Sequence, residues 1–367
     1  MDFKIFSTFT GAGGLDIGFH GDFDFLGRYF PKLPFTTEYA LEYNKDAITS
    51  LEKNKKYFKN TKLIHKDITE NIEKEVLKYK PKEYDIFLGG FPCVTFSVVG
   101  KQEGLKNDKD GQLYESFAKY VERLQPKVFI AENVKGILSA NKGEAVKIIK
   151  KRFELDGYKL KIFLVNFADF GVPQLRERVL FIGIRNDIKT EFIPPEFTHK
   201  NNHITSKEAF KYLPKNCIHT QHLKVSDKVV ERLKLIPQGK NFKAVENTPY
   251  AVKGLMSNIY RRLHEDEPAY TVIASGGGGT WGYHFKEHRP LTNRERARLQ
   301  SFPDWFEFQG TETNQYTQIG NAVAPNFAFH LAKNIKNHLM GTSVENYPVI
   351  EFEQLKLFEN EAVYQFR

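Results

Sequence analysis

The sequence predicts an α/β protein, in which a doubly wound, mostly parallel sheet is joined by a second, smaller and irregular domain. Short apolar runs alternate with helically spaced apolar residues through the first half of the chain, which is typical of a parallel sheet wrapped by helices. A glycine-rich turn follows the first run and precedes a predicted helix. From about Asn186 the alternation fades, and helical order returns only near Thr292.

Seven apolar runs are the predicted strands, because each is short and bounded by polar or turn residues. They are Ile5–Phe9, Thr36–Leu41, Lys62–His65, Tyr84–Leu88, Lys127–Ala131, Lys161–Asn166 and Val179–Ile184. Between them, apolar residues recur at helical spacing in two segments, which predicts helices that pack against the sheet. These residues are Leu113, Phe117, Tyr120, Val121 and Leu124 in the first segment, and Val146, Ile149 and Phe153 in the second.

The second half of the chain begins with segments rich in proline, asparagine and lysine, and it contains a glycine run at 276–279. Thr292 and Glu295 form a capping-box pattern that opens a short helix. A final helix, which would pack back against the sheet, is predicted from the apolar face of Ala328, Leu331, Ala332, Ile335 and Leu339. We therefore expect residues 1–185 and 289–342 to form one discontinuous domain, residues 186–288 a second domain, and residues 343–367 a C-terminal extension.

Composition and charge limit the class of protein. At 367 residues and 41% hydrophobic, the chain can bury the core of one or two domains. No apolar stretch approaches the roughly 18 residues of a membrane helix, and the N-terminus lacks a signal pattern. Two cysteines, Cys93 and Cys217, argue against a disulfide scaffold and favour a cytoplasmic location. The net charge of +9 indicates affinity for polyanions, and residues 186–289 hold 16 Lys/Arg against 11 Asp/Glu.

The turn Phe9–Leu15 contains three glycines, which can let a cofactor approach the backbone. It lacks the full dinucleotide spacing, so a turn without any ligand is an open alternative. Glu42 lies near the end of the second predicted strand, where an acid can accept hydrogen bonds from ribose hydroxyls. Tyr43 offers a flat face for a purine, and Asp67 with Ile68 follows the third strand, where the acid could receive an adenine amino group. Each acid could equally be a solvated cap at a strand end.

The most informative pattern is a cysteine and a glutamate at the ends of two strand-like runs. Cys93 follows Gly90-Phe91-Pro92, and Glu132 lies 39 positions later. The thiol is a candidate nucleophile, since nearby backbone N–H groups could stabilise its thiolate, although free cysteine is also common in apolar cores. Burying a glutamate after an apolar strand costs desolvation free energy, so a functional role or a partner is expected for it. Partial burial would also favour its protonated form, which would suit it to proton donation. Arg178 is either its partner or a surface charge. The pairing suggests covalent catalysis.

In order along the chain, these and further motifs resemble the DNA (cytosine-5) methyltransferases, bacterial type II modification enzymes. The motifs are FTGAGG (9–14), Glu42, Asp67, GGFPC (89–93), ENV (132–134), QLRER (174–178), RPLTNRERARLQSFPD (289–304) and QIGNAV (318–323). The resemblance implies the Rossmann-like fold of S-adenosylmethionine-dependent methyltransferases, with residues 186–288 as a target-recognition domain. Val94 and the segment 108–111 depart from the family pattern near the expected DNA-facing loop.

The resemblance also implies a mechanism and its residues. Cys93 would add to C6 of a flipped-out cytosine, Glu132 would hydrogen-bond or protonate N3, Arg178 would hold O2 and Arg176 would support the pocket. The methyl donor would be S-adenosyl-L-methionine, which leaves as S-adenosyl-L-homocysteine, and no metal is expected. Residues that match the family's cofactor site are Phe9, Gly11, Gly13, Gly14, Glu42, Tyr43, Asp67, Ile68, Pro92, Leu113, Asn321 and Ala322.

The implied partner is double-stranded DNA, with a restriction endonuclease as a functional rather than physical partner, and a monomer is the default. Thr271 and Val272 match a Thr-aliphatic pair of the family's recognition domains. Arginines could read guanines or neutralise phosphates, and the glycine run could bring backbone close to DNA. The candidate DNA-binding residues are Ser97, Arg261, Arg262, Thr271, Ser275 and Gly276.

Three other functions remain as alternatives. A tRNA cytosine-5 methyltransferase would share the catalytic residues, although Ser97 in Cys-Val-Thr-Phe-Ser favours DNA within the resemblance. A catalytically silent DNA-binding protein would keep the fold but has no need of Cys93, Glu132 and Arg178. A nicotinamide dehydrogenase would need the full dinucleotide glycine pattern and leaves Cys93 unexplained.

Overall fold

The computed structural model describes residues 2–91, 109–214, 217–253, 257–274 and 282–342. All seven predicted strands lie in one sheet, in the order β5-β4-β1-β6-β7-β10-β8. The strand bounds are β5 (Lys62–His65), β4 (Phe35–Glu42), β1 (Phe3–Thr8), β6 (Ile86–Gly89), β7 (Val128–Val134), β10 (Glu177–Arg185) and β8 (Tyr158–Asn166). Only β10 runs against its neighbours, so the predicted doubly wound, mostly parallel sheet is confirmed.

Strand β6 and the first four residues of β7 are continuous apolar runs because helices cover both of their faces. Their parallel register pairs Ile86 with Val128 and Gly89 with Ala131. Since both strands end at the same edge of the sheet, the segment after Gly89 and the side chain of Glu132 emerge beside each other.

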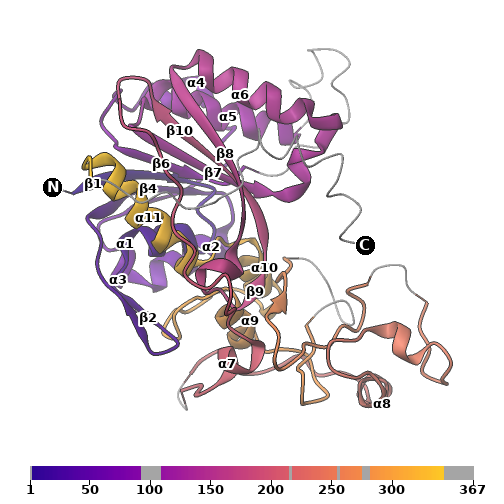
Figure 1. Cartoon of the computed structure of the whole chain (residues 1–367). Coiled ribbons are helices and arrows are strands. Elements are labelled where there is room, and N and C mark those ends of the chain that lie inside the picture. Colours follow the sequence, from indigo (N-terminus) through magenta and orange to yellow (C-terminus); the bar gives the residue numbers. More distant parts are fainter. Residues whose placement is uncertain (1, 92–108, 215–216, 254–256, 275–281, 343–367) are drawn as a thin grey trace.

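Two layers of helices enclose the sheet (Figure 1). One face carries α4 (Ile72–Val76), α5 (Lys109–Leu124) and α6 (Glu144–Leu155), and the other carries α1 (Gly14–His20), α2 (Lys45–Lys53), α3 (Lys55–Phe58) and α11 (Pro325–Leu339). Alternate strand residues feed two separate cores: Ile5 and Leu88 pack into the core on the α1 side, whereas Phe6 and Phe87 pack into the core on the α5 side. The period-two alternation of strand side chains therefore stabilises both layers.

The last helix returns to the start of the chain. α11 packs against α1 so closely that a Cβ atom on Gly18 would lie 2.3 Å from the Cβ of Ala328. This approach requires glycine on α1, and it buries a long apolar face of α11. The predicted final helix is thus present and completes the core on the α1 side.

The middle of the chain has little regular structure and lies beside one edge of the sheet (Figure 1). Its elements are α7 (Ser206–Phe210), α8 (Asp227–Leu235), η5 (Phe242–Val245) and β11 (Ala269–Tyr270). The short strand β11 pairs in parallel with β9 (Gln174–Leu175), within the QLRER motif. This pairing brings the end of the irregular region against the QLRER motif.

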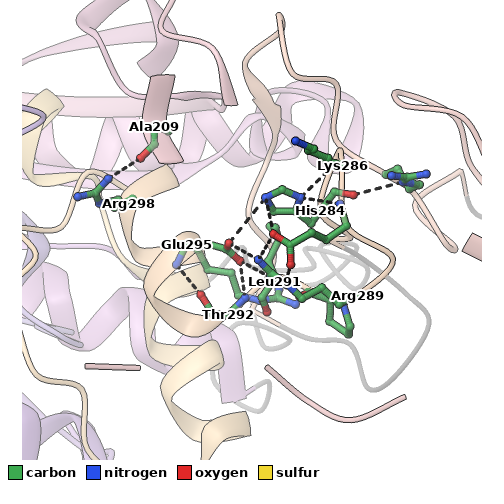
Figure 2. A network of polar contacts seen from close by, with 12 residues as sticks. Ala209, His284, Lys286, Arg289, Leu291, Thr292, Glu295 and Arg298 are labelled. Carbon is green, nitrogen blue, oxygen red and sulfur yellow. Dashed lines mark hydrogen bonds and ion pairs between the residues drawn. The ribbon is translucent and has the colours of Figure 1, made fainter. Parts of the chain in front are cut away.

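The predicted helix after Thr292 is α9 (Asn293–Leu299), and its capping box with Glu295 is formed. Figure 2 shows the polar network around it. Arg289 donates two hydrogen bonds of 2.8 Å to the carboxylate of Glu295, and Arg298 donates to the carbonyl of Ala209 at 3.0 Å. Because Ala209 belongs to α7, the α9 arginines join the irregular region to the sheet domain.

Among the elements that were not predicted is a hairpin of β2 (Phe23–Phe25) and β3 (Arg28–Phe30). Its turn residues Leu26 and Gly27 both have positive φ, 49° and 77°, the geometry that suits a two-residue hairpin. Leu is rare at the first of these two positions, so Gly27 alone did not predict the hairpin. The remaining elements are η2 (Lys135–Leu138), η3 (Ala140–Gly143), η4 (Phe167–Phe170) and α10 (Glu312–Asn321).

Candidate active site

A cavity of about 510 Å³ opens at the carboxyl edge of β1, β4, β6 and β7. Its walls come from the turn after β1, the ends of β4 and β7, the QLRER motif, residues 271–274 and residues 317–323. Chain segments hundreds of residues apart therefore meet around one space. The predicted site residues that line it are Phe9, Gly11, Gly14, Glu42, Tyr43, Glu132, Arg176, Arg178, Thr271, Asn321 and Ala322.

Glu132 and Arg178 form an ion pair in the wall of this cavity. They stand on the antiparallel neighbours β7 and β10, where Leu180 lies opposite Glu132 and Arg178 opposite Val134. The Nε of Arg178 is 2.8 Å from Oε1 of Glu132, and the two side chains are only 12% and 13% exposed. Of the two interpretations of Arg178, partner or surface charge, the structure supports the partner. Removing either charge would leave the other buried without compensation.

The strand that leads to the predicted nucleophile runs beside Glu132. A Cβ atom on Gly90 would lie 3.3 Å from the backbone oxygen of Glu132, so the residue at 90 must be small for the two strands to keep this distance. Asn133 Nδ2 donates to the carbonyl of Phe91 at 2.9 Å in a buried position. Asn133 thereby anchors the chain just before Cys93, a role that its sequence pattern did not predict. Cys93, Pro92 and Ser97 themselves lie outside the described residues.

Arg176 is fully buried and ties three segments together. Its guanidinium donates to the carbonyls of Val272 at 2.9 Å, Gly320 at 2.9 Å and Ala322 at 3.3 Å. Burial, with the nearby charge of Arg178, lowers the pKa of Arg176 to about 9. The contacts place it as a link between the β11 segment and the QIGNAV motif.

Gln174 makes a second link of the same kind, which the sequence did not reveal. Its Nε2 donates to the carbonyl of Leu299 at 2.6 Å, and its Oε1 accepts from the backbone N–H of Val272 at 2.9 Å. The only signal was its place at the start of the QLRER motif. Gln174 is buried and bonded to backbone groups of two other segments, so it holds these segments together and takes no part in the proposed reaction.

The turn after β1 is held by a carboxylate. Glu42 Oε2 accepts from the backbone N–H of Gly11 at 2.8 Å, and Oε1 accepts from that of Asn44 at 2.8 Å. Glu42 is 5% exposed, and burial raises the pKa of its carboxyl above the ordinary value. Gly11 has φ +55°, a left-handed conformation that favours glycine. Glu42 therefore shapes the turn, and its remaining lone pairs face the cavity.

Four predicted cofactor residues are not part of the cavity walls. Gly13 faces the core, since a Cβ there would lie 2.5 Å from the ring of Phe58. Asp67 accepts from the backbone N–H of Thr69 at 2.9 Å, as a turn residue does, and Ile68 is buried in the α5-side core. Leu113 packs against that same core. Their assignment as cofactor contacts stays a prediction.

Arg261 and Arg262, two neighbouring arginines of the expected DNA surface, have different environments in the structure. Arg261 is partly exposed, with its guanidinium 3.5 Å from the ring centre of Tyr270. Arg262 is buried, and its guanidinium donates to the carbonyls of Leu233, Ile236, His284 and Phe285. All three guanidinium nitrogens of Arg262 bind backbone oxygens, which argues against a contact between Arg262 and DNA, and that assignment stays a prediction.

Thr271, which lines the cavity, donates to the carbonyl of Leu175 at 2.7 Å. This contact continues the pairing of β11 with β9 and holds the Thr-aliphatic pair against the QLRER motif. Ser275 and Gly276 lie outside the described residues. No group of three or more metal-ligating side chains occurs in the part of the chain that the structure describes, and no helix there is long and apolar enough to cross a membrane.

Comparisons with known proteins agree with this architecture. The family model of C-5 cytosine-specific DNA methylases matches residues 3–337. The type II methyltransferase M.NgoFVII of Neisseria gonorrhoeae is 42% identical, over 99% of this chain and 93% of its own length. M.BbvI of Brevibacillus brevis, another type II methyltransferase, is 39% identical over 89% of each chain. Among solved structures, a candidate DNA modification methyltransferase encoded within an E. coli prophage has a TM-score of 0.70 at 23% identity, over 92% of this chain and all of that one.

The sheet order and the cavity at the carboxyl edge define an α/β enzyme with the Rossmann-like methyltransferase fold. The chain belongs to the family of C-5 cytosine-specific DNA methylases. It is a DNA (cytosine-5) methyltransferase, as the resemblance of its motifs implied.

Proposed function

We propose that this enzyme methylates C5 of a flipped-out cytosine at a short recognition sequence in double-stranded DNA, through a covalent bond between Cys93 and C6. The observation that carries the proposal is the buried pair of Glu132 and Arg178 in the cavity wall, next to the strand end that leads to Cys93. A polar pair of this kind, enclosed and facing a cavity, suits recognition of a planar base with adjacent hydrogen-bonding groups.

Cytosine C5 becomes nucleophilic only when electron density is pushed into the ring. In the proposed step the thiolate of Cys93 forms a bond to C6, and the displaced electron pair spreads over C5 and N3. In this step Glu132 takes part as the protonated carboxylic acid and stabilises the charge by donating a hydrogen bond or its proton to N3, while Arg178 holds Glu132 and the O2 of the base. After C5 is methylated, a water molecule takes the C5 proton, the freed electron pair re-forms the C5–C6 double bond as the Cys93 thiolate leaves C6, and N3 returns its proton to Glu132.

The cavity fits S-adenosyl-L-methionine as the methyl donor. Its volume of about 510 Å³ lies within the usual range for ligand sites. On one side Glu42 is positioned to accept hydrogen bonds from ribose hydroxyls, and Phe9 and Tyr43 offer apolar faces. Residues Asn321 and Ala322 complete the wall from the end of the chain. When bound, the cofactor supplies an electrophilic methyl group.

Double-stranded DNA is the proposed substrate because the chain is basic and the irregular region of residues 186–288 carries a surplus of Lys and Arg. A base inside a duplex cannot reach a cavity in the protein, so the target must be flipped out. Relatives named type II methyltransferases support a role in protecting DNA within a restriction–modification system. A monomer in the bacterial cytoplasm remains the prediction.

Base-resolution mapping of 5-methylcytosine tests the proposal. DNA is sequenced from cells that express the wild type, Cys93→Ser, Glu132→Gln, or the control Glu177→Gln. Glu177 is a suitable control because it pairs with Lys135 on the surface, close to the site. We expect one short methylated sequence with the wild type and the control, and none with the other two variants. Full methylation by Cys93→Ser would sink the covalent mechanism, and methylation of tRNA alone would change the substrate.

A further inference from the structure

Asp16 is a buried carboxylate on the floor of the cavity that the proposed mechanism does not use. It lies in the first turn of α1, lines the cavity and is 0% exposed to solvent. Its Oδ2 accepts a hydrogen bond from Ser7 Oγ at 3.0 Å, and its Oδ1 accepts one from Thr37 Oγ1 at 2.9 Å. Both partners are neutral hydroxyls on the sheet strands β1 and β4.

No cation compensates this carboxylate among the residues that the structure describes. None of the ion pairs there includes Asp16, and the cavity wall around it is formed by Ser7, Thr8, Thr10 and Leu15. Glu42, another acid in the same wall, adds further negative potential. The two basic residues of the cavity are already engaged: Arg178 binds Glu132, and Arg176 binds backbone carbonyls. Burial of an ionised carboxylate in this wall costs desolvation free energy, and a cationic ligand in the cavity would offset that cost.

The carboxylate is connected to the cofactor turn. Thr10 Oγ1 donates to Ser7 Oγ at 3.1 Å, and Ser7 in turn donates to Asp16. Burial raises the pKa of Asp16 to about 6, so the group is mostly ionised at pH 7.5 or above. The charge is therefore fixed below the turn of residues 9–14 and has no freedom to reach solvent.

We infer that Asp16 supplies the countercharge for a cationic ligand in this cavity, so that the sulfonium form of the cofactor is favoured over its neutral thioether product. The inference rests on the proposed function, since it assigns a charge-selecting role within the proposed cofactor site. Asp16 acts at a distance, as a residue that sets the potential of the cavity, and it touches neither the base nor the reacting methyl group. Such selection assists turnover because the product is bound less tightly relative to the methyl donor.

The test compares the binding of S-adenosyl-L-methionine and S-adenosyl-L-homocysteine by calorimetry at pH 7.5. Asp16→Asn removes the charge and keeps the size of the side chain. It should weaken binding of the cationic ligand about tenfold more than binding of the neutral one, the effect of one charge across several ångströms of protein. Thr317→Val is the matched control, because it removes a hydroxyl of the cavity wall that donates to the carbonyl of Thr313 and leaves Asp16 and both of its hydrogen bonds unchanged. It should leave the ratio of the two affinities unchanged.

Equal weakening of both ligands by Asp16→Asn would show a purely structural role and overturn the inference. If that variant does not fold, Asp16→Ser, which also removes the charge, is measured in its place with the same criterion. Failure of the wild type to bind either ligand would instead overturn the proposed cofactor site, and the inference with it. The two failures are therefore distinguishable.

Discussion

Gly14 and Val323 lie so close together that a Cβ atom on Gly14 would be 2.2 Å from the carbonyl oxygen of Val323. The two residues belong to the first and last motifs of the chain, and both line the cavity. One wall of the cavity is therefore formed where the segment of residues 317–323 packs onto the turn after β1. This contact explains why a third glycine is needed in FTGAGG, since its φ is not in the left-handed region.

Gly14→Ala should push the segment of Val323 away from the turn. We expect a loss of about 1–3 kcal/mol in the free energy of unfolding, typical of overpacking, together with weaker binding of S-adenosyl-L-methionine. Denaturant unfolding and calorimetry measure the two effects. Gly136→Ala is the control, because a Cβ at Gly136 meets nothing within 4 Å. If Gly14→Ala left stability and affinity unchanged, the segment of Val323 could move away from the turn without disturbing the fold or the cavity.

Arg178→Lys should lower the rate of methyl transfer by about 100-fold, the usual effect of losing one positioned donor in an active site. The lysine keeps the charge but has no Nε–H to place 2.8 Å from Glu132. Single-turnover methylation of a duplex that contains the mapped site provides the measurement. Arg185→Lys is the control, since Arg185 lies at the far end of β10 and pairs with Asp187 on the surface. A rate within threefold of the wild type would argue against a catalytic role for Arg178.

We expect Arg262 to contribute to the stability of the fold and its neighbour Arg261 to contribute to DNA binding. Arg262→Ala leaves several buried carbonyl oxygens without a donor, and it should lower the free energy of unfolding by about 3 kcal/mol or more. Arg261→Ala should leave stability nearly unchanged and weaken DNA binding, with a smaller dependence on salt. Thermal unfolding and DNA titrations at two salt concentrations separate the effects. The reverse pattern would restore Arg262 as a DNA contact.

His20 provides a pH prediction. Its Nε2 accepts from the backbone N–H of Thr37 at 3.1 Å, so the ring is neutral, and burial lowers its pKa from 6.5 to about 4. A depressed pKa contributes stability that is complete above about pH 6.5 and is lost as the pH falls toward 4. Between pH 7 and 4 the wild type should lose about 3 kcal/mol more than His20→Gln. Gln can still accept a hydrogen bond from Thr37, and Asp16 titrates in both proteins, so the difference between them reports on His20 alone. If the free energy of unfolding changed with pH in the same way in both proteins, the assignment to His20 would be wrong.

Much of the fold could be predicted from local patterns. All seven strands lie where short apolar runs were recognised, because burial on both faces of a central sheet imposes a composition that is visible along the chain. The capping box of Thr292 was equally visible, since its two partners are three residues apart. The β2–β3 hairpin was missed because Leu26 adopts a turn conformation that its residue type rarely favours.

The site divides in the same way. The order of Cys93, Glu132 and Arg178 along the chain predicted the chemistry that we propose for this enzyme, and that prediction required only the sequence. The tertiary structure decided which polar residues face the cavity and which face the core. Arg261 and Arg262 are adjacent and chemically identical, yet one stacks on Tyr270 and the other is enclosed by backbone carbonyls. The buried linkers Asn133 and Gln174 and the uncompensated Asp16 were likewise invisible. Burial and hydrogen-bond partners are set by segments distant in sequence, and only packing brings these together.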